Sequence, residues 1–432
     1  MKQASLPAPT ALGERARKVL DENWTGDHTV PSRSLYPHQW SWDSGFIAIG
    51  LAVAAPERGW RELRSLFCAQ WPDGRVPHIV FDPDVAERDY FPGPAFWDAP
   101  QPPDSDHATT GVIQPPVHAL AAWELYRRTG DGDQLSWLYP RLVAQQNYLA
   151  RNRDLGGNGL ASIVHPWESG QDNSPAWDLP LAAVPADMDL LRRHRRRDIA
   201  VAESQDRPTD ADYARYIALA ESYRAGGYRD ADLLDRHPFV VEDPAFNAIV
   251  AAAELSLADI AEAVGADPVP HKAEAARITH AVVTRLYDRE TGMFHARDVR
   301  TGGRSPAHCI GGLIPLLLPD LPAELADSLV QQASSDRFGM HELPVPSYDR
   351  TAPDFDTHRY WRGPIWVNMN WLLLRGLRVH GYYDRARMLR RSMLAMIERC
   401  GCYEYYHPVT CEGIGAEEFS WTAALALDML FS

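Results

Sequence analysis

The sequence predicts an all-α protein with the architecture of an (α/α)6 barrel, a closed ring of helical hairpins, in which an inserted segment caps the mouth where an active site is expected. Apolar residues recur three and four positions apart in about twelve stretches, as at Phe246, Ile249, Val250, Ala253 and Leu257. Short connections carry Gly at the end of one stretch and Asp or Pro before the next. Short links between long helices indicate antiparallel pairs, and about twelve helices in such pairs favour a closed ring.

In the first part of the chain, the helical period predicts helices at residues 10–22, 43–54, 57–69, 115–129 and 132–152. The junction ELYRRTGDGDQLSWLY ends one helix at a Gly and starts the next after an Asp. The segments between these helices include long loops, at residues 28–42, 71–113 and 154–180. Loops of this length often carry binding and catalytic groups on a rigid scaffold.

In the second part, helices are expected at residues 209–226, 243–264, 269–286, 322–334, 364–379, 382–399 and 415–431. The junctions DIAEAVGADPVPHKAEAA and GLRVHGYYDRARMLRRS repeat the pattern of Gly followed by a new helix start. Alternation typical of strands is limited to CYEYYH and GMFHARD. Long loops at 288–308 and 336–363 are expected at the same end of the ring as the earlier ones.

The chain divides into a first barrel part, residues 1–178, an inserted cap, residues 179–235, and a second barrel part, residues 236–432. Within the insert, residues 179–208 break the helical pattern and contain a basic run from Arg192 to Arg197. A run of like charges is usually a solvated face, and we interpret this one so.

Composition excludes several classes of protein. The net charge of −15 argues against a nucleic-acid partner, which selects a basic surface. No apolar run reaches the roughly 18 residues of a membrane span, and the N-terminal stretch lacks the apolar middle of a signal peptide. We therefore expect a cytoplasmic protein without a membrane partner, either a monomer or a homo-oligomer.

No metal or cofactor is expected. The five cysteines are odd in number and sparse, so they do not form a disulfide framework. Cys400, Cys402 and Cys411 lack a fourth ligand with finger-like spacing. The stretch from Asp104 to His107 is interpreted as a polar loop. The chain has no Walker loop, no dinucleotide-binding Gly motif and no H-E-x-x-H.

The stretch HPWESGQDNSPAWD is the most informative part of the chain. It combines Glu168, Asp172 and Asp178 with Trp167 and Trp177, and its Gly and Pro residues make it a loop. A carboxyl group walled by indoles stays protonated at neutral pH and can donate its proton to a sugar oxygen. Indole faces also offer platforms for the C–H face of a sugar ring.

Four further segments combine aromatic residues with acids or other polar groups, and together they indicate a sugar-binding pocket. Their candidate residues are Tyr36, Trp40, Trp42, Asp43, Tyr90, Tyr360, Trp361, Trp366 and Glu404. Hydrolysis of a glycosidic bond needs two carboxyl groups. Asp172 and Glu404, one from each half of the chain, are the preferred pair, although spacing alone does not rank them above Asp43 and Glu168.

These motifs together resemble glycoside hydrolase family 63, in its bacterial branch that acts on glucosylglycerate and mannosylglycerate. The resemblance runs nearly from end to end, through YPHQWSWDSGF, VPHIVF, YFPGP, GVIQPP, SGQDNSPAWD, RPTDADYARY, YWRGPIWVNMNW, YEYYHPVT and FSWTAAL. It implies an (α/α)6 barrel with an insertion, inversion at the anomeric carbon and no metal. The chain departs from the family at Thr410, Cys411 and Glu412, where a turn commonly carries glycine.

The resemblance also implies residue roles. It makes Asp172 the general acid and Glu404 the general base. Tyr36, Trp40, Asp43 and Gln114 are then expected to hold the sugar, with Trp361 and Trp366 lining its pocket. Arg207 and Tyr213 are expected to hold the glycerate carboxylate, with Arg215 and Tyr216 as the alternative pair. The expected substrate is glucosylglycerate, and the glucosylglycerate-cleaving enzymes are expected to be the nearest relatives.

Other functions remain open at this point. Mannosylglycerate is an alternative substrate, because mannose and glucose differ at one hydroxyl. Trehalose or an oligoglucoside is another, and neither needs Arg207. A sugar epimerase on a helical barrel and a non-enzymatic sugar-binding protein are the remaining alternatives. The histidines of the chain are scattered rather than paired as an epimerase requires, and the two carboxyl groups in aromatic settings argue against a simple binding protein.

Overall fold

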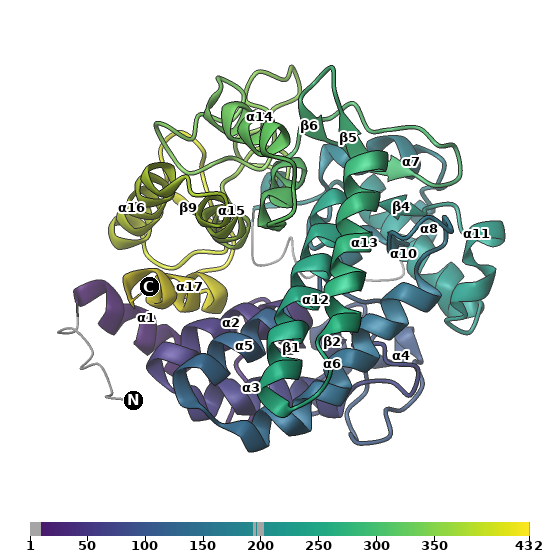
Figure 1. Ribbon diagram of the computed structural model, residues 1–432. Coiled ribbons are helices and arrows are strands. Elements are labelled where there is room, and N and C mark those ends of the chain that lie inside the picture. Colours follow the sequence, from purple (N-terminus) through teal and green to yellow (C-terminus); the bar gives the residue numbers. More distant parts are fainter. Residues whose placement is uncertain (1–9, 193–195, 197–202, 432) are drawn as a thin grey trace.

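The computed structural model describes residues 10–192, 196 and 203–431, and in them two concentric rings of helices surround one axis (Figure 1). The inner ring consists of α2 (Ser41–Ala54), α5 (His118–Thr129), α12 (Pro244–Val264), η6 (Ile310–Leu317), α15 (Val367–Val379) and α17 (Ser420–Phe431). Each of these packs against the next, and α17 closes the ring on α2. The outer ring consists of α1 (Ala11–Glu22), α3 (Pro56–Cys68), α6 (Gly132–Asn152), α13 (Val269–Leu286), α14 (Ala323–Ser334) and α16 (Tyr383–Cys400).

Outer and inner elements alternate along the chain, so the predicted (α/α)6 barrel is confirmed. The inner helices are apolar on nearly all sides, because each contacts two ring neighbours and an outer helix. Small residues allow close approach at the crossing of α2 and α17. A Cβ atom added to Gly50 would overlap the carbonyl oxygen of Ala424.

Helix α12 corrects the expectation that no segment is long and apolar enough to cross a membrane. Its 21 residues have a mean hydropathy of 1.3 over an 18-residue window, and 83% of that window is buried inside the protein. α12 packs on α5, α6, α13 and η6, which accounts for its apolar composition.

The predicted helices are present, but one of them is not in the ring and one ring element was missed. The stretch predicted at 209–226 is α10 (Asp210–Ala225), which lies between the ring helices α6 and α12 and within the predicted insert. The missing ring element is η6, a 3-10 helix that contains Gly311, Gly312 and Pro315. Its eight residues are too short and too uniformly apolar to carry a helical period. The last helix begins at Ser420 rather than at residue 415, because Gly415 and Glu418 adopt left-handed conformations, with φ of 78° and 51°.

The strands are two residues long and pair antiparallel at the ends of the barrel. The pairs are β1 (Gln39–Trp40) with β2 (Ile79–Val80), β3 (Ser162–Ile163) with β4 (Val241–Glu242), β4 with β7 (Arg297–Asp298), β5 (Tyr287–Asp288) with β6 (Met293–Phe294), and β8 (Tyr405–Tyr406) with β9 (Gly413–Ile414). The strand signals in CYEYYH and GMFHARD therefore mark β8, β6 and β7. Single-turn 3-10 helices are η1 (Glu87–Asp89), η2 (Pro166–Ser169), η3 (Pro175–Trp177), η4 (Ser204–Asp206) and η5 (Asp230–Asp232).

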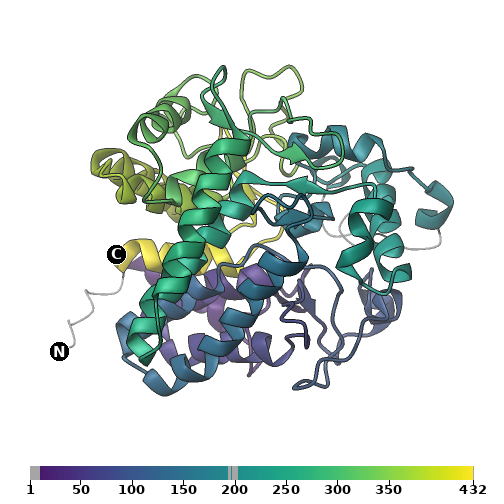
Figure 2. The ribbon, with the colours of Figure 1, turned by 45° about the vertical axis from the view of Figure 1, so that its right-hand side comes forward.

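In its described residues, the predicted insert contributes the 16-residue helix α10 and three short helices that lie beside the barrel, together with part of the loop 71–113 (Figure 2). They are α7 (Asp178–Ala182), α8 (Met188–Arg192), α10 and α11 (Leu233–Arg236), and α4 (Pro94–Trp97) lies in the loop. Thr209 and Asp212 form a capping box at the start of α10. The Tyr213 hydroxyl donates to the Phe91 carbonyl oxygen at 3.2 Å, and α10 also packs on α4.

The basic run in the insert is not a uniform solvated face. Arg193, Arg195 and Arg197 lie outside the described residues. Arg192 is exposed, but Arg196 is only 5% exposed. Its guanidinium donates to Asp210 at 2.8 Å and lies over the ring of Tyr213 at 4.5 Å. The prediction that the basic run forms a solvated face is therefore wrong for Arg196.

Candidate active site

A deep pocket opens at the mouth of the barrel, and residues from both halves of the chain and from the insert line it. We call it the mouth pocket. All of the predicted site residues except Trp361 line it, namely Tyr36, Trp40, Trp42, Asp43, Tyr90, Gln114, Trp167, Asp172, Arg207, Tyr213, Tyr360, Trp366 and Glu404. The long loops and helix starts that were expected to meet at one end of the barrel therefore line one pocket.

Trp361 does not line the mouth pocket, which corrects the prediction. It is 1% exposed and stacks flat on Trp366, with ring centroids 3.8 Å apart. Trp361 therefore lies behind the pocket wall and supports Trp366. Lining residues that were not predicted include His78, Phe91, Pro208, Phe419 and Trp421. All of them stand in motifs already singled out, VPHIVF, YFPGP, RPTDADYARY and FSWTAAL, so the signal for them was present in the sequence.

Tyr216 also lines the mouth pocket, whereas Arg215 does not. Arg215 pairs with Asp212 at 3.6 Å, and its Nε donates to the Val184 carbonyl oxygen at 3.2 Å. Of the two arginines considered for the substrate carboxylate, Arg207 is the one that reaches the pocket.

Glu404 lies one residue before β8, and its side chain is 1% exposed. The β8–β9 hairpin holds it, because the Glu404 backbone NH donates to the Ala416 carbonyl oxygen at 2.9 Å and the Ala416 NH donates to Oε2 at 3.1 Å. Gly415 permits this contact. Its φ is +78°, and a Cβ there would lie 2.6 Å from Oε2.

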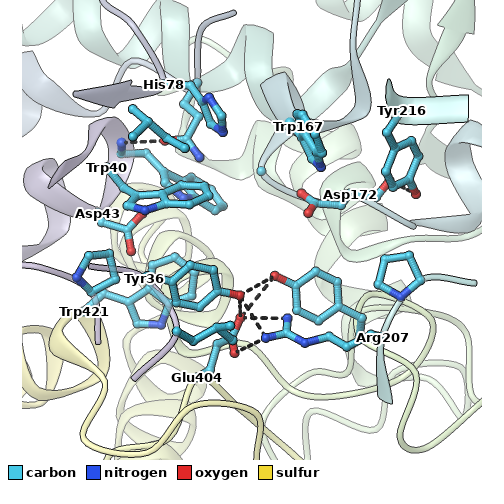
Figure 3. A pocket seen from close by; sticks show the side chains of 18 of the residues that line it. Tyr36, Trp40, Asp43, His78, Trp167, Asp172, Arg207, Tyr216, Glu404 and Trp421 are labelled. Atoms are coloured by element: carbon cyan, nitrogen blue, oxygen red, sulfur yellow. Dashed lines mark hydrogen bonds and ion pairs between the residues drawn. The ribbon is translucent and has the colours of Figure 1, made fainter. Parts of the chain in front are cut away.

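Two tyrosine hydroxyls and one arginine complete the surroundings of Glu404 (Figure 3). Tyr36 donates to Oε1 at 2.7 Å, and Tyr360 donates to the same atom at 3.1 Å. Arg207 donates from Nη1 to Oε1 at 3.3 Å and from Nη2 to Oε2 at 3.2 Å. Burial and the neighbouring Glu404 charge raise the pKa of Tyr36 well above its ordinary value, so its hydroxyl stays protonated and donates.

Tyr360 adopts a left-handed conformation, with φ of 45°. Non-glycine residues adopt it rarely, and in an active site such strain is held by surrounding contacts. Here the Trp366 indole donates to the Tyr360 carbonyl oxygen at 3.0 Å. The conformation directs the Tyr360 hydroxyl to Glu404. Burial is the main reason that the pKa of Tyr360 is raised well above its ordinary value.

Asp172 enters the mouth pocket from another wall, beside Trp167 and Tyr216 (Figure 3). Two side chains hold the loop around Asp172 by donating hydrogen bonds to its backbone carbonyl oxygens. The Trp177 indole donates to the Gln171 carbonyl oxygen at 2.7 Å, and the Tyr216 hydroxyl donates to the Asp172 carbonyl oxygen at 3.0 Å. The position of the Asp172 carboxyl group is therefore set by both the barrel loop and the insert.

The other acidic candidates, Glu168, Asp178 and Asp43, differ in their surroundings. Glu168 is fully buried outside the mouth pocket, where Arg153 donates to both of its oxygens at 2.7 Å. Asp178 pairs with Arg362 at 2.8 Å and is half exposed. Asp43 does line the pocket. Burial and then the charge of Glu404 raise the pKa of Asp43 well above its ordinary value.

The aromatic wall offers unused hydrogen-bond donors. In the described part of the chain, the indole nitrogens of Trp40 and Trp421 are buried without a partner, although both residues line the mouth pocket. A buried polar group without a partner is costly, and a ligand oxygen can satisfy it. The walls therefore combine apolar faces with donors, as sugar recognition requires. No cluster of three or more His, Cys, Asp or Glu arranged for a metal ion occurs among residues 10–192, 196 and 203–431.

Comparisons with known proteins agree with one another. Residues 36–422 match the family described as the mannosylglycerate hydrolase MGH1-like glycoside hydrolase domain. The chain is 41% identical to a mannosylglycerate hydrolase of Rubrobacter radiotolerans, over 98% of each chain. It is 36% identical to a glucosylglycerate hydrolase of Mycolicibacterium hassiacum, also over 98% of each chain.

A solved structure gives the same result. The GH63 mannosylglycerate hydrolase from Thermus thermophilus, in complex with Tris and D-glycerate, matches with a TM-score of 0.90 at 40% identity, over 96% of this chain and 99% of that one. The expectation that glucosylglycerate hydrolases are the nearest relatives is not confirmed, because the identity to the Rubrobacter enzyme is higher than that to the Mycolicibacterium enzyme. The chain belongs to glycoside hydrolase family 63, among the mannosylglycerate hydrolase MGH1-like enzymes, and is a glycoside hydrolase.

Proposed function

We propose that this enzyme hydrolyses the bond between an α-linked hexose and glycerate, with inversion at the anomeric carbon. The observation that carries the proposal is the arrangement of Asp172 and Glu404, two carboxyl groups from separate halves of the chain that enter one aromatic pocket from different walls. An inverting glycosidase needs one carboxyl group on each face of the sugar, with roughly 6.5–9.5 Å between them to leave room for a water molecule.

In the proposed mechanism, Asp172 donates its proton to the bridging oxygen while the bond from that oxygen to the anomeric carbon breaks. Glu404 takes a proton from a water molecule, whose oxygen forms the new bond on the opposite face. The products are the hexose and glycerate, and the proton gained by Glu404 returns to Asp172 through solvent. The raised pKa of Asp43, due mainly to burial, suits it to donate a hydrogen bond to a sugar hydroxyl rather than to act as the base.

Glycerate is the proposed aglycone because of Arg207. Among the described residues that line the mouth pocket, Arg207 is the one arginine or lysine. Arginine binds carboxylates through two parallel hydrogen bonds. Mannosylglycerate is proposed first and glucosylglycerate second, because the enzyme of higher identity named above is a mannosylglycerate hydrolase. The division of the chain into barrel residues 1–178 and 236–432 and a cap of residues 179–235 is kept as a proposal, and it makes the cap the source of Arg207.

Parallel assays with mannosylglycerate, glucosylglycerate and trehalose test this function. We expect turnover of one or both glycerate glycosides and none of trehalose. Asp172→Asn and Glu404→Gln should each lower kcat by about 10² to 10⁴. Asp178→Asn is the matched control, because it removes a carboxyl group from the same loop but outside the pocket, and it should keep wild-type kcat. Turnover of trehalose alone would refute the proposed aglycone, and an active Glu404→Gln enzyme would refute the proposed base.

A further inference from the structure

Arg207 contacts both oxygens of Glu404, and we propose that it blocks this base until the carboxylate of the substrate draws it away. The inference rests on the proposed function. It makes Arg207 a specificity-determining residue that acts on turnover, in addition to holding the aglycone. An acidic substrate then activates the enzyme that cleaves it.

The hydrogen bonds of Glu404 are the first argument. Oε1 accepts from Tyr36, Tyr360 and Arg207, and Oε2 accepts from Arg207 and the Ala416 NH. A carboxylate has about four lone-pair directions. These contacts fill them, so a water molecule has no free position on Glu404. A general base must lie within hydrogen-bond reach of the proton that it removes. Glu404 is therefore well held here but not available for water.

Removing Arg207 leaves three donors on about four lone-pair directions, so it frees one position, on Oε2. The bonds from Tyr36, Tyr360 and the Ala416 NH do not depend on Arg207, and they keep the carboxylate in place. The hydroxyl of Tyr36 also accepts from Arg207 Nη2 at 3.0 Å, so it loses a donor but keeps its own bond to Glu404. Glu404 thus remains oriented while its Oε2 becomes accessible to water.

Arg207 does not leave without a replacement partner. Its side chain is 2% exposed and that of Glu404 is 1% exposed. Separating such a pair leaves two buried charges uncompensated, which is strongly unfavourable. A substrate carboxylate removes this obstacle, because it gives Arg207 a new bidentate partner in place of Glu404. The exchange keeps the guanidinium paired throughout.

The guanidinium has one unused hydrogen-bond donor. Its Nε is buried without a partner in the described part of the chain. The carbon of the guanidinium lies 4.7 Å from the ring centroid of Tyr360, so the group is held between aromatic surface and Glu404. As Arg207 turns away from Glu404, a substrate carboxylate can take Nε and one Nη together, so the unused donor gains a partner as the old pair breaks.

Glycosyl fluorides separate the carboxylate from the glycoside. Fluoride is a small leaving group, so the space for the aglycone stays empty and added D-glycerate can occupy it. We would measure kcat for α-mannosyl fluoride and α-glucosyl fluoride with and without D-glycerate, and with glycerol as the uncharged control. D-glycerate should raise kcat by about 10-fold or more, because freeing Glu404 restores part of the roughly 10²–10⁴-fold that a general base contributes. Glycerol should have no effect.

Two variants sharpen the test. Arg207→Gln should cleave the fluorides fast without D-glycerate and should not respond to it, whereas its activity on glycerate glycosides falls. Arg215→Gln is the matched control, an arginine nearby in the insert that does not line the mouth pocket, and it should respond like the wild type.

Inhibition or no effect of D-glycerate on the wild type would overturn the inference without any variant. Loss of fluoride hydrolysis in a folded Arg207→Gln enzyme would also overturn it, and would make Arg207 a permanent support of Glu404. Either result leaves the proposed function intact if the glycerate glycosides are still cleaved. Absence of turnover of every glycerate glycoside and both fluorides would instead refute the proposed function, and this inference with it.

Discussion

The side-chain oxygen of Asn173 accepts the backbone NH of Trp361 at 2.9 Å, and this bond joins the two loops that carry the chemistry of the site. Asn173 follows the proposed acid, Asp172. Trp361 follows Tyr360, which contacts the proposed base, Glu404. One hydrogen bond between neighbours of the reacting groups therefore ties the two carboxyl groups to a common frame.

We predict that Asn173→Ala lowers kcat by about 10-fold or more, because small displacements of catalytic groups reduce rates strongly. The loss of one buried hydrogen bond should lower the free energy of unfolding by only about 1–3 kcal/mol. Steady-state kinetics and urea unfolding of the same preparation measure both effects. Wild-type kcat in the variant would mean that the two loops are positioned without this bond.

Arg153 and Glu168 should matter for stability rather than for chemistry. Both side chains are fully buried, and Glu168 also accepts the backbone NH groups of Ile113 and Val164. Breaking a buried pair by removing one charge costs about 3–5 kcal/mol. Arg153→Met should therefore lower the free energy of unfolding by that amount in urea titrations. A variant of wild-type stability but greatly reduced kcat would contradict this assignment and return Glu168 to the list of catalytic candidates.

The close crossing of α2 and α17 can be tested at Gly50. Gly50→Ala places a Cβ against the backbone of Ala424 and should destabilise the fold by about 1–3 kcal/mol, as overpacked cores do. Gly132→Ala is the matched control, because nothing lies within 4 Å of its added Cβ, and alanine is the better helix former. Thermal unfolding should show a lower Tm for the first variant and an unchanged or higher Tm for the second. Equal Tm values would rule out the tight crossing.

Buried His165 should make the fold sensitive to acid. Burial lowers its pKa from 6.5 to about 3, so the unfolded chain binds a proton there that the folded chain does not. The stability contributed by neutral His165 is present above about pH 6.5 and is lost as the pH falls toward 3. Between pH 7 and pH 5 this loss amounts to about 2 kcal/mol. In His165→Asn the fall in unfolding free energy over that interval should be smaller by this amount, and an unchanged fall would contradict the assignment.

The sequence predicted most of the ring, because the outer helices carry clear apolar periods, most inner helices are long apolar stretches, and several junctions between them carry Gly. It missed η6, because Gly311, Gly312 and Pro315 break the period within eight residues and only the ring neighbours hold the segment in place. The helical period at 209–226 was correct, but periodicity does not say whether a helix belongs to the ring or to an insert.

The sequence predicted which residues form the candidate site better than it predicted how they are arranged in space. Trp361 and Trp366 have the same motif environment in the sequence, and only packing decides that Trp366 lines the pocket while Trp361 stacks behind it. The ion pair of Arg207 with Glu404 joins residues 197 positions apart, so no local pattern indicates it. The carboxyl groups of Glu168 and Asp172 are likewise equivalent in the sequence and become distinct through Arg153.

Proton NMR of the first hexose released from mannosylglycerate and glucosylglycerate tests the central claim most directly. Inversion by Asp172 and Glu404 predicts that the β-anomer appears first and that the α-anomer follows only at the rate of mutarotation. Initial release of the α-anomer would contradict the account, because it requires a covalent intermediate and a carboxyl separation of about 5 Å.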